Sequence, residues 1–210
     1  MKSVIVTGAT GGLGTIVTQH LRTTGWNVIT VNGRTTDLAR MDAVEQFVAS
    51  VAEPVTGLVH LVGGILPAAP VHTTTIDDFN WYVAVNLTTT YTIVRAMMPR
   101  LIQSGSGSIV TIGAYDALHQ TAHRSLYAAT KSAVVAFTKA IAEEGKPDNI
   151  RANVIVPSII RTPANLEWGD ADEVPKWVDP GHVAQTIEFL LSPSCGLNGA
   201  VLTMPGGLTL

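Results

Sequence analysis

The sequence predicts an α/β fold in which helices cover both faces of a doubly wound parallel β-sheet, giving three layers, α/β/α. Two observations lead to this prediction. Short runs rich in β-branched residues alternate along the chain with longer segments of helical periodicity, which is the pattern of βαβ units. A glycine-rich turn, Gly8 to Gly14, joins the first of these runs to the first helical segment, as it does where parallel sheets bind a phosphate group.

Six strands are predicted, over residues 3–7, 27–31, 57–62, 108–112, 151–156 and 200–203. Five helices are predicted between them, over residues 13–24, 41–51, 76–104, 126–145 and 180–191. Only residues 32–40 separate the second strand from the helix 41–51, which is too short for a further helix and strand. We therefore expect a trimmed crossover after the second strand.

The chain has 210 residues, of which 46% are hydrophobic and 14% charged. This length suits one domain with a sizeable core better than two domains. The low charge and high apolar content indicate a chain that folds throughout. We expect residues 1–210 to form a single dinucleotide-binding domain.

The charges exclude two classes of partner. Lys and Arg number 13 against 16 Asp and Glu, for a net charge of −3, and the basic residues do not cluster, so we expect no nucleic acid and no membrane as partner. No apolar stretch approaches the roughly 20 residues that span a bilayer.

The single cysteine, Cys195, cannot form an internal disulfide. A reducing, cytoplasmic location is the expectation.

The segment 158–177 differs in composition from the rest of the chain. It contains Pro and Gly, two Trp residues and a cluster of acids between Glu167 and Glu173. It follows the carboxyl end of a predicted strand, where open α/β sheets place their ligands. We expect a substrate lid here; the alternative is an ordinary surface excursion.

The first turn reads Thr7-Gly8-Ala9-Thr10-Gly11-Gly12-Leu13-Gly14. Glycines allow a sharp turn and let backbone N–H groups approach a pyrophosphate, while the following helix adds the positive end of its dipole. The spacing differs from the common Gly-x-Gly-x-x-Gly fingerprint. It resembles the turn of the short-chain dehydrogenase/reductase superfamily, with Gly8, Gly12 and Gly14 in its three glycine positions. This resemblance implies a Rossmann-type fold and a nicotinamide cofactor, with Thr10 and Leu13 also at the cofactor.

The end of the second strand bears on which nicotinamide cofactor binds. Enzymes that use NAD usually carry an acid there for the ribose 2′-hydroxyl, whereas a 2′-phosphate requires a cation. Here Asn32 takes the acid position and Arg34 follows two residues later. NADP(H) is therefore favoured over NAD(H), although Arg34 could also be a solvated turn residue. Asp37 and Leu38 resemble the superfamily's acid and apolar pair at the adenine.

Tyr127 and Lys131 lie four residues apart, on one face of the predicted helix 126–145. A tyrosine has a pKa of about 10, and a nearby cation can lower it by roughly 1 to 3 units, which would make the phenol a general acid or base. The alternative is a surface pair. The position matches the superfamily's Tyr-x-x-x-Lys, which implies that Tyr127 exchanges a proton with substrate while Lys131 also holds the nicotinamide ribose.

Further positions match the superfamily in the same way. The resemblance implies that Asn86, on the helix 76–104, keeps a proton-relay water near Lys131. Pro157 and Thr162 match the turn at the nicotinamide carboxamide, and Gly63 keeps the glycine of the superfamily's Asn-Asn-Ala-Gly. His60 precedes this turn and is expected to be a strand histidine.

One departure from the superfamily concerns catalysis. The catalytic serine is replaced by Ala114, so the hydroxyl that polarises the substrate oxygen is missing. Tyr115, Thr111 or a water could replace it. Alternatively the substrate needs less polarisation, as in the dihydropteridine reductase-like branch, which lacks this serine and reduces a C=N system. A third alternative is a non-catalytic NADP(H)-binding sensor.

The stretch before Tyr127 usually borders the substrate. His119 and His123, with Asp116 and Arg124, could form a polar rim there, and Ala114 and Tyr115 are further candidates for substrate contact. No metal site is expected, since no third ligand has convincing spacing. The expected function is NAD(P)(H)-dependent oxidoreduction of a small carbonyl or alcohol, in a homodimer or homotetramer paired through the helices that begin at Ile76 and Leu126.

Overall fold

A computed structural model describes residues 2–31, 33 and 35–207. It contains one sheet of six parallel strands in the order β2-β1-β3-β4-β5-β6. The strands are β1 (Ser3–Thr7), β2 (Asn27–Thr30), β3 (Gly57–His60), β4 (Gly107–Ile112), β5 (Ile150–Pro157) and β6 (Val201–Met204). The predicted doubly wound, Rossmann-type α/β fold is confirmed.

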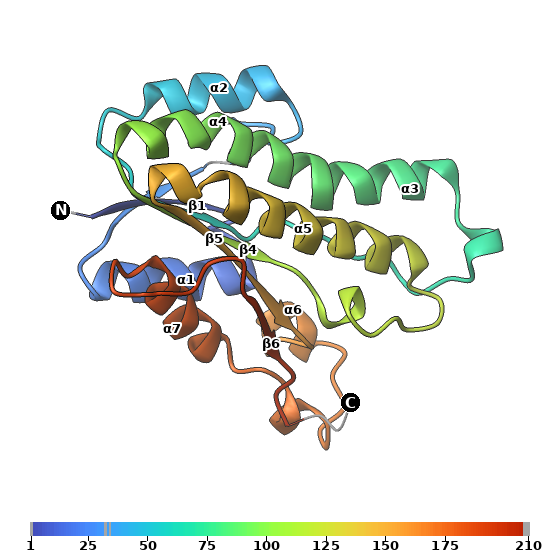
Figure 1. Ribbon diagram of the computed structural model, residues 1–210. Helices are drawn as coiled ribbons and strands as arrows, with labels where there is room; N and C mark the ends of the chain where they lie inside the picture. Colours follow the sequence, from blue (N-terminus) through green and yellow to red (C-terminus); the bar gives the residue numbers. More distant parts are fainter. Residues whose placement is uncertain (1, 32, 34, 208–210) are drawn as a thin grey trace.

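The helices are α1 (Gly12–Thr23), α2 (Met41–Ser50), α3 (Ile76–Tyr82), α4 (Thr89–Gln103), α5 (Ser125–Glu144), α6 (Pro163–Leu166) and α7 (Pro180–Leu191). Figure 1 shows α2, α4 and α5 over one face of the sheet, and α1 and α7 over the other. Most predicted boundaries agree to within one residue, which is the ordinary uncertainty of element ends. In the described part of the chain, no helix is both long and apolar enough to cross a bilayer.

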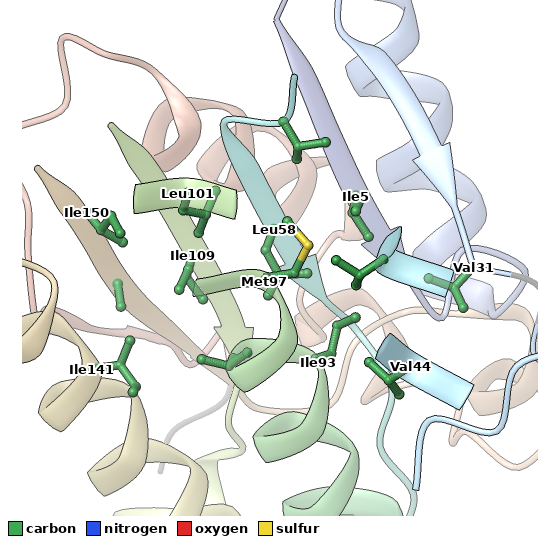
Figure 2. Close-up of a cluster of buried hydrophobic side chains, with 14 of the residues drawn as sticks. Ile5, Val31, Val44, Leu58, Ile93, Met97, Leu101, Ile109, Ile141 and Ile150 are labelled. Atoms are coloured by element: carbon green, nitrogen blue, oxygen red, sulfur yellow. The ribbon is translucent and has the colours of Figure 1, made fainter. Parts of the chain in front are cut away.

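A hydrophobic core fills each face of the sheet because the strands are apolar on both sides. On one face, Ile5 and Leu58 from the strands pack against Ile93 and Met97 of α4 (Figure 2). On the other face, α1 and α7 pack against the sheet through a second cluster that includes Leu21 and Ile187. The sheet is thus held rigidly between helices, which fixes the positions of the loops at its carboxyl edge.

The trimmed crossover is confirmed in the strand order. The chain leaves β2, passes through α2 and returns as β3 on the other side of β1. The common dinucleotide-binding order has three strands on each side of this point, whereas here only β1 and β2 lie on the first side. The strand order therefore reverses between β1 and β3, which is where such sheets bind their ligands.

The helix predicted over residues 76–104 is interrupted in a way that the sequence did not indicate. A π-helical turn, Val83–Thr88, separates α3 from α4. Helical periodicity predicts one regular helix, but a π turn inserts an extra residue without ending the helix, and such turns are frequent at functional sites. Asn86 lies in this turn and is fully buried.

The strand predicted over residues 57–62 ends earlier, at His60. Its neighbour β1 ends at Thr7, the partner of His60, so no strand remains for residues 61 and 62 to pair with on that side. His60 is 2% exposed, with Thr7 Oγ1 2.8 Å from Nδ1 and Thr89 Oγ1 3.3 Å from Nε2. Burial lowers the His60 pKa to about 3, as befits the structural histidine that was predicted.

The segment 158–177 folds over the carboxyl end of β5 as two short helical pieces, α6 and the 3-10 turn Val174–Lys176. Trp177 is buried and Trp168 packs against it with the two rings tilted by 43° and their centroids 5.0 Å apart. An ion pair between Arg161 and Asp179 joins this segment to the start of α7. Its role as a lid remains a prediction.

Candidate active site

The carboxyl ends of β1, β3, β4 and β5 meet at one edge of the sheet. The strand register pairs Thr7 with His60, His60 with Thr111 and Ile112 with Ile155. The loops that follow these strands carry Gly8, Gly63, Ala114 and Thr162. The structure therefore gathers most of the predicted site residues at a single edge.

The glycine turn after β1 has a geometry that only glycine fits. Gly8 has a φ of +69°, in the left-handed region that glycine favours. A Cβ on Gly14 would lie 1.9 Å from the Gly8 carbonyl oxygen, so α1 packs directly on the turn. The N-cap of α1 makes no side-chain hydrogen bond and its first turn holds no acid. Its N–H groups are thus available to an anion such as a pyrophosphate.

The loop after β5 closes on this turn. A Cβ on Gly12 would lie 2.9 Å from the Cβ of Thr162, so Thr162 stands beside the start of α1. Pro157 ends β5 and is buried. Thr10 is exposed on the turn and Leu13 is half-buried against the core. The arrangement forms a cradle of backbone between the two loops, and it fits the dinucleotide that the turn predicts.

The two residues that favour NADP(H), Asn32 and Arg34, lie outside the described residues. Asp37 is exposed, and its Oδ1 accepts a hydrogen bond of 2.9 Å from the Ala39 N–H. Leu38 is buried in the core, and its carbonyl accepts a hydrogen bond from Thr92 Oγ1. The contact of this pair with adenine remains a prediction.

Lys131, Asn86 and Gly63 meet behind the loop that follows β3. Lys131 Nζ donates to the Ile112 carbonyl over 3.0 Å. A Cβ on Gly63 would lie 2.8 Å from Lys131 Nζ and 3.0 Å from Asn86 Oδ1, so only a glycine leaves room for both. Lys131 is 5% exposed, and burial lowers its pKa to about 8.

The side chain of Asn86 ties this loop to α5. Its Oδ1 accepts from the Gly64 N–H at 3.0 Å, and its Nδ2 donates to the Gly64 carbonyl at 3.1 Å and to Thr130 Oγ1 at 3.3 Å. Besides its predicted proton-relay role, Asn86 therefore positions the loop after β3 against α5. Sequence reasoning missed Thr130, although its place inside the Tyr-x-x-x-Lys motif was a usable signal.

Tyr127 and Lys131 both lie on α5, but the predicted lowering of the phenol's pKa is wrong for this structure. Burial, and after it the charge of Asp116, raise the pKa of Tyr127 to about 12, with Arg124 partly opposing them. The Lys131 ammonium is instead directed to the Ile112 carbonyl. Desolvation disfavours the phenolate, so Tyr127 stays protonated well above neutral pH.

Ala114 is buried two residues after β4 ends, and the structure excludes one of the groups that could replace the missing hydroxyl. Thr111 Oγ1 lies 2.8 Å from Thr138 Oγ1 inside the core, so Thr111 is wrong as a substitute. Tyr115 is half-buried and stacks on the exposed His119, with ring centroids 4.2 Å apart.

The remaining rim residues lie close to Tyr127. Asp116 follows Ala114 by two residues, and its Oδ1 is buried without a hydrogen-bond partner among the described residues. A pocket of about 170 Å³ is lined by Tyr82, His123, Arg124 and Tyr127, among others. None of its lining residues comes from the glycine turn, so this pocket is not the cofactor cradle.

Within the described chain, no group of acids, histidines or cysteine could hold a metal ion.

Comparisons with known proteins concern the chain as a whole. The family model described as enoyl-(acyl carrier protein) reductase matches residues 18–209. A curated relative, 7alpha-hydroxysteroid dehydrogenase of Bacteroides fragilis, is 26% identical over 245 residues, covering 100% of this chain and 95% of that protein.

Two solved structures share the fold. The first, 3-ketoacyl-(acyl-carrier-protein) reductase from Brucella melitensis complexed with NADH, has a TM-score of 0.90 at 23% identity and covers 100% of this chain and 98% of that one. The second, a variant of ElxO with NADPH bound, has a TM-score of 0.89 at 22% identity and covers 98% of each chain.

Proposed function

The chain belongs to the short-chain dehydrogenase/reductase superfamily of nicotinamide-dependent oxidoreductases, and from this premise we propose that it interconverts a small carbonyl compound and its alcohol. In this proposal Tyr127 is the general acid or base. The observation that carries it is the meeting of Lys131, four residues after Tyr127 on α5, with the Gly63 loop, which in turn packs on the glycine turn at one edge of the sheet.

The nicotinamide cofactor, when bound, supplies or accepts the hydride. The backbone N–H groups from Gly8 to Gly14 would hold its pyrophosphate, Lys131 its nicotinamide ribose and Thr162 its carboxamide. Because the pKa of Tyr127 is raised to about 12, its hydroxyl carries a proton at neutral pH. A carbonyl oxygen that gains the charge of an alkoxide is a stronger base than the phenolate, so the phenol can donate this proton in the direction of reduction.

We expect NADPH to bind at least about tenfold more tightly than NADH, since hydrogen bonds from Arg34 to a 2′-phosphate contribute about 1.5 to 3 kcal/mol. Titration of each cofactor by its fluorescence measures this ratio. Arg34→Ala should abolish the preference, while Arg40→Ala, which removes an exposed arginine paired with Asp42, should leave it. A preference for NADH would overturn the role of Arg34, and binding of neither cofactor would overturn the proposed function.

A second candidate function is reduction of a C=N bond, and the observation that favours it is Ala114. A protonated C=N carbon is already electrophilic, so it needs no hydroxyl to polarise it. Reduction of a carbonyl does need that help.

We expect Ala114→Ser to raise kcat/KM for a simple ketone about tenfold, which is less than the 10² to 10³ that an oxyanion donor contributes in a site built around it. The rate on a protonated imine should stay unchanged in the same variant. Steady-state assays of both substrates with the preferred cofactor measure this. An unchanged ketone rate would mean that the missing hydroxyl is not limiting, and cofactor binding without turnover of either substrate would favour a sensor.

We also propose a homodimer or homotetramer formed through α3, α4 and α5. Large apolar side chains on α3 and α4 are exposed, among them Ile76 at 70%, Phe79 at 45% and Tyr91 at 47%. Apolar surface of this kind on neighbouring helices is typical of an interface between subunits.

A further inference from the structure

The pocket of about 170 Å³ beside Tyr127 contains an arginine, Arg124, that the proposed reaction does not use. This pocket lies between α3 and the start of α5 (Figure 1). Tyr82 lines it as well, but the Tyr82 hydroxyl is already engaged, since it accepts a hydrogen bond of 2.9 Å from the Leu66 N–H. The polar groups that remain for a ligand are therefore concentrated at the start of α5.

Arg124 is a cation without a partner among the residues that the structure describes. None of the ion pairs there includes it, and its guanidinium donates no hydrogen bond to them. The residue is half-buried, and its backbone is held by a hydrogen bond of 2.8 Å from the Ala128 N–H to its carbonyl. A guanidinium has five N–H donors, so a partly desolvated one with none of them used favours an anion from outside the chain.

The pocket also contains an acid, Asp78, but this carboxylate is committed to the start of α3. Its Oδ2 accepts hydrogen bonds from the backbone N–H and the hydroxyl of Thr75, at 2.8 and 2.9 Å. These bonds lower the pKa of Asp78, and the positive end of the α3 dipole helps to balance its charge. Asp78 therefore does not neutralise Arg124, and the first turn of α5 holds no other acid.

Arg124 and Tyr127 are close enough for one small molecule to contact both. Arg124 is the N-cap of α5 and Tyr127 lies three residues later, in its first turn, so the two side chains are neighbours on the helix surface. Both line the same pocket. The effect on the phenol agrees with this: burial raises the pKa of Tyr127, and the charge of Arg124 acts against it.

We propose that Arg124 binds a carboxylate of the substrate, so that the carbonyl compound reduced beside Tyr127 is a small oxo acid. This inference rests on the proposed carbonyl reduction and names its substrate class. A guanidinium can donate two parallel hydrogen bonds to a carboxylate. A phosphate monoester would instead bring a charge of about −1.5 to −2 into a pocket that already contains Asp78, so a carboxylate fits the single arginine better.

The carboxylate takes no part in the chemical step. The hydride adds to the carbonyl carbon of the oxo acid, the π electron pair moves to the oxygen, and the Tyr127 hydroxyl gives its proton to that oxygen. The product is the hydroxy acid with its carboxylate unchanged. Arg124 is thus a specificity-determining residue, which holds one end of the substrate while the other end reacts.

The test compares 4-oxopentanoate with 4-oxopentanamide, which has nearly the same shape and no charge. The wild-type protein should prefer the acid, and Arg124→Gln should lower the ratio of kcat/KM for acid to kcat/KM for amide about tenfold to a hundredfold, as the loss of hydrogen bonds between charged groups does. The ratio is the readout because any effect of Arg124 on the Tyr127 phenol is common to both substrates. Arg22→Gln, which alters an exposed arginine on α1, is the control and should leave the ratio unchanged.

A binding measurement separates this inference from the proposed function. Pentanoate has the carboxylate but no carbonyl to reduce, so its binding requires no turnover and no cofactor. In an NMR titration it should bind the wild-type protein at least tenfold more tightly than it binds Arg124→Gln, whereas pentanamide should bind both proteins alike.

Equal binding of pentanoate by the two proteins, or an acid-to-amide ratio that Arg124→Gln leaves unchanged, overturns the role of Arg124. Failure to bind either nicotinamide cofactor would overturn the proposed function, and the pentanoate comparison would still decide whether Arg124 holds a carboxylate.

Discussion

Tyr127→Phe is expected to lower kcat/KM for ketone reduction by about a thousandfold, within the 10² to 10⁴ that a positioned general acid contributes. The ring keeps its place beside Tyr82, since the centroids of the two rings are 6.2 Å apart and the substitution removes only the hydroxyl. Cofactor affinity should therefore be unchanged. Stopped-flow or steady-state oxidation of the preferred reduced cofactor measures the rate, and fluorescence titration measures the affinity.

The matched control is Tyr91→Phe, because Tyr91 is a half-exposed tyrosine on α4 that packs on Phe137. It should keep the wild-type rate. The protonated imine provides a second comparison: its reduction needs no proton, so Tyr127→Phe should slow it far less than it slows the ketone. A ketone rate that Tyr127→Phe leaves intact would contradict the assignment of Tyr127 as the acid.

Lys131→Met is expected to abolish most ketone turnover and at the same time to stabilise the fold. Lys131 is 5% exposed, and burial lowers its pKa from 10.5 to about 8, which corresponds to roughly 3 kcal/mol of cost for keeping the ammonium charged. Methionine fills a similar volume without charge, but it leaves the Ile112 carbonyl without its donor, which costs about 1 kcal/mol. The net expected gain is about 2 kcal/mol in the free energy of unfolding.

The difference in unfolding free energy between Lys131→Met and the wild type should depend on pH in a definite direction. A lysine whose pKa is lowered by folding binds fewer protons in the folded state, so its cost is present at neutral pH and disappears as the pH rises from about 8 towards 10.5. The stability advantage of Lys131→Met over the wild type should shrink across that window. Urea unfolding at neutral and at alkaline pH measures it. A variant that is less stable at neutral pH, or an advantage that does not change with pH, would contradict the stated cause.

Such an exchange of stability for function is expected where an active site holds a buried charge. The sequence could locate Lys131 by the Tyr-x-x-x-Lys spacing, but the energetic cost depends on its burial between Gly63 and Ile112. Those two residues are distant from it along the chain and meet it only at the sheet edge.

The sequence by itself determined the architecture of this protein. Alternating apolar runs and helical periods defined the strands and most helix ends, because both patterns reflect which side chains are buried. The glycine turn was also visible in the sequence, since Gly8 and Gly14 occupy positions where a Cβ would clash or strain the backbone. The short crossover after β2 was predicted from the number of residues available.

Only the tertiary structure decided the electrostatics of the site. The spacing of Tyr127 and Lys131 suggested that the ammonium lowers the phenol's pKa, yet burial and Asp116 raise it, because desolvation and long-range charges depend on elements that the local sequence does not specify. The π turn that buries Asn86 and the unpartnered oxygen of Asp116 were likewise invisible in the sequence. Periodicity records which residues are buried, whereas the direction of a hydrogen bond is set by neighbours that only the folded sheet brings together.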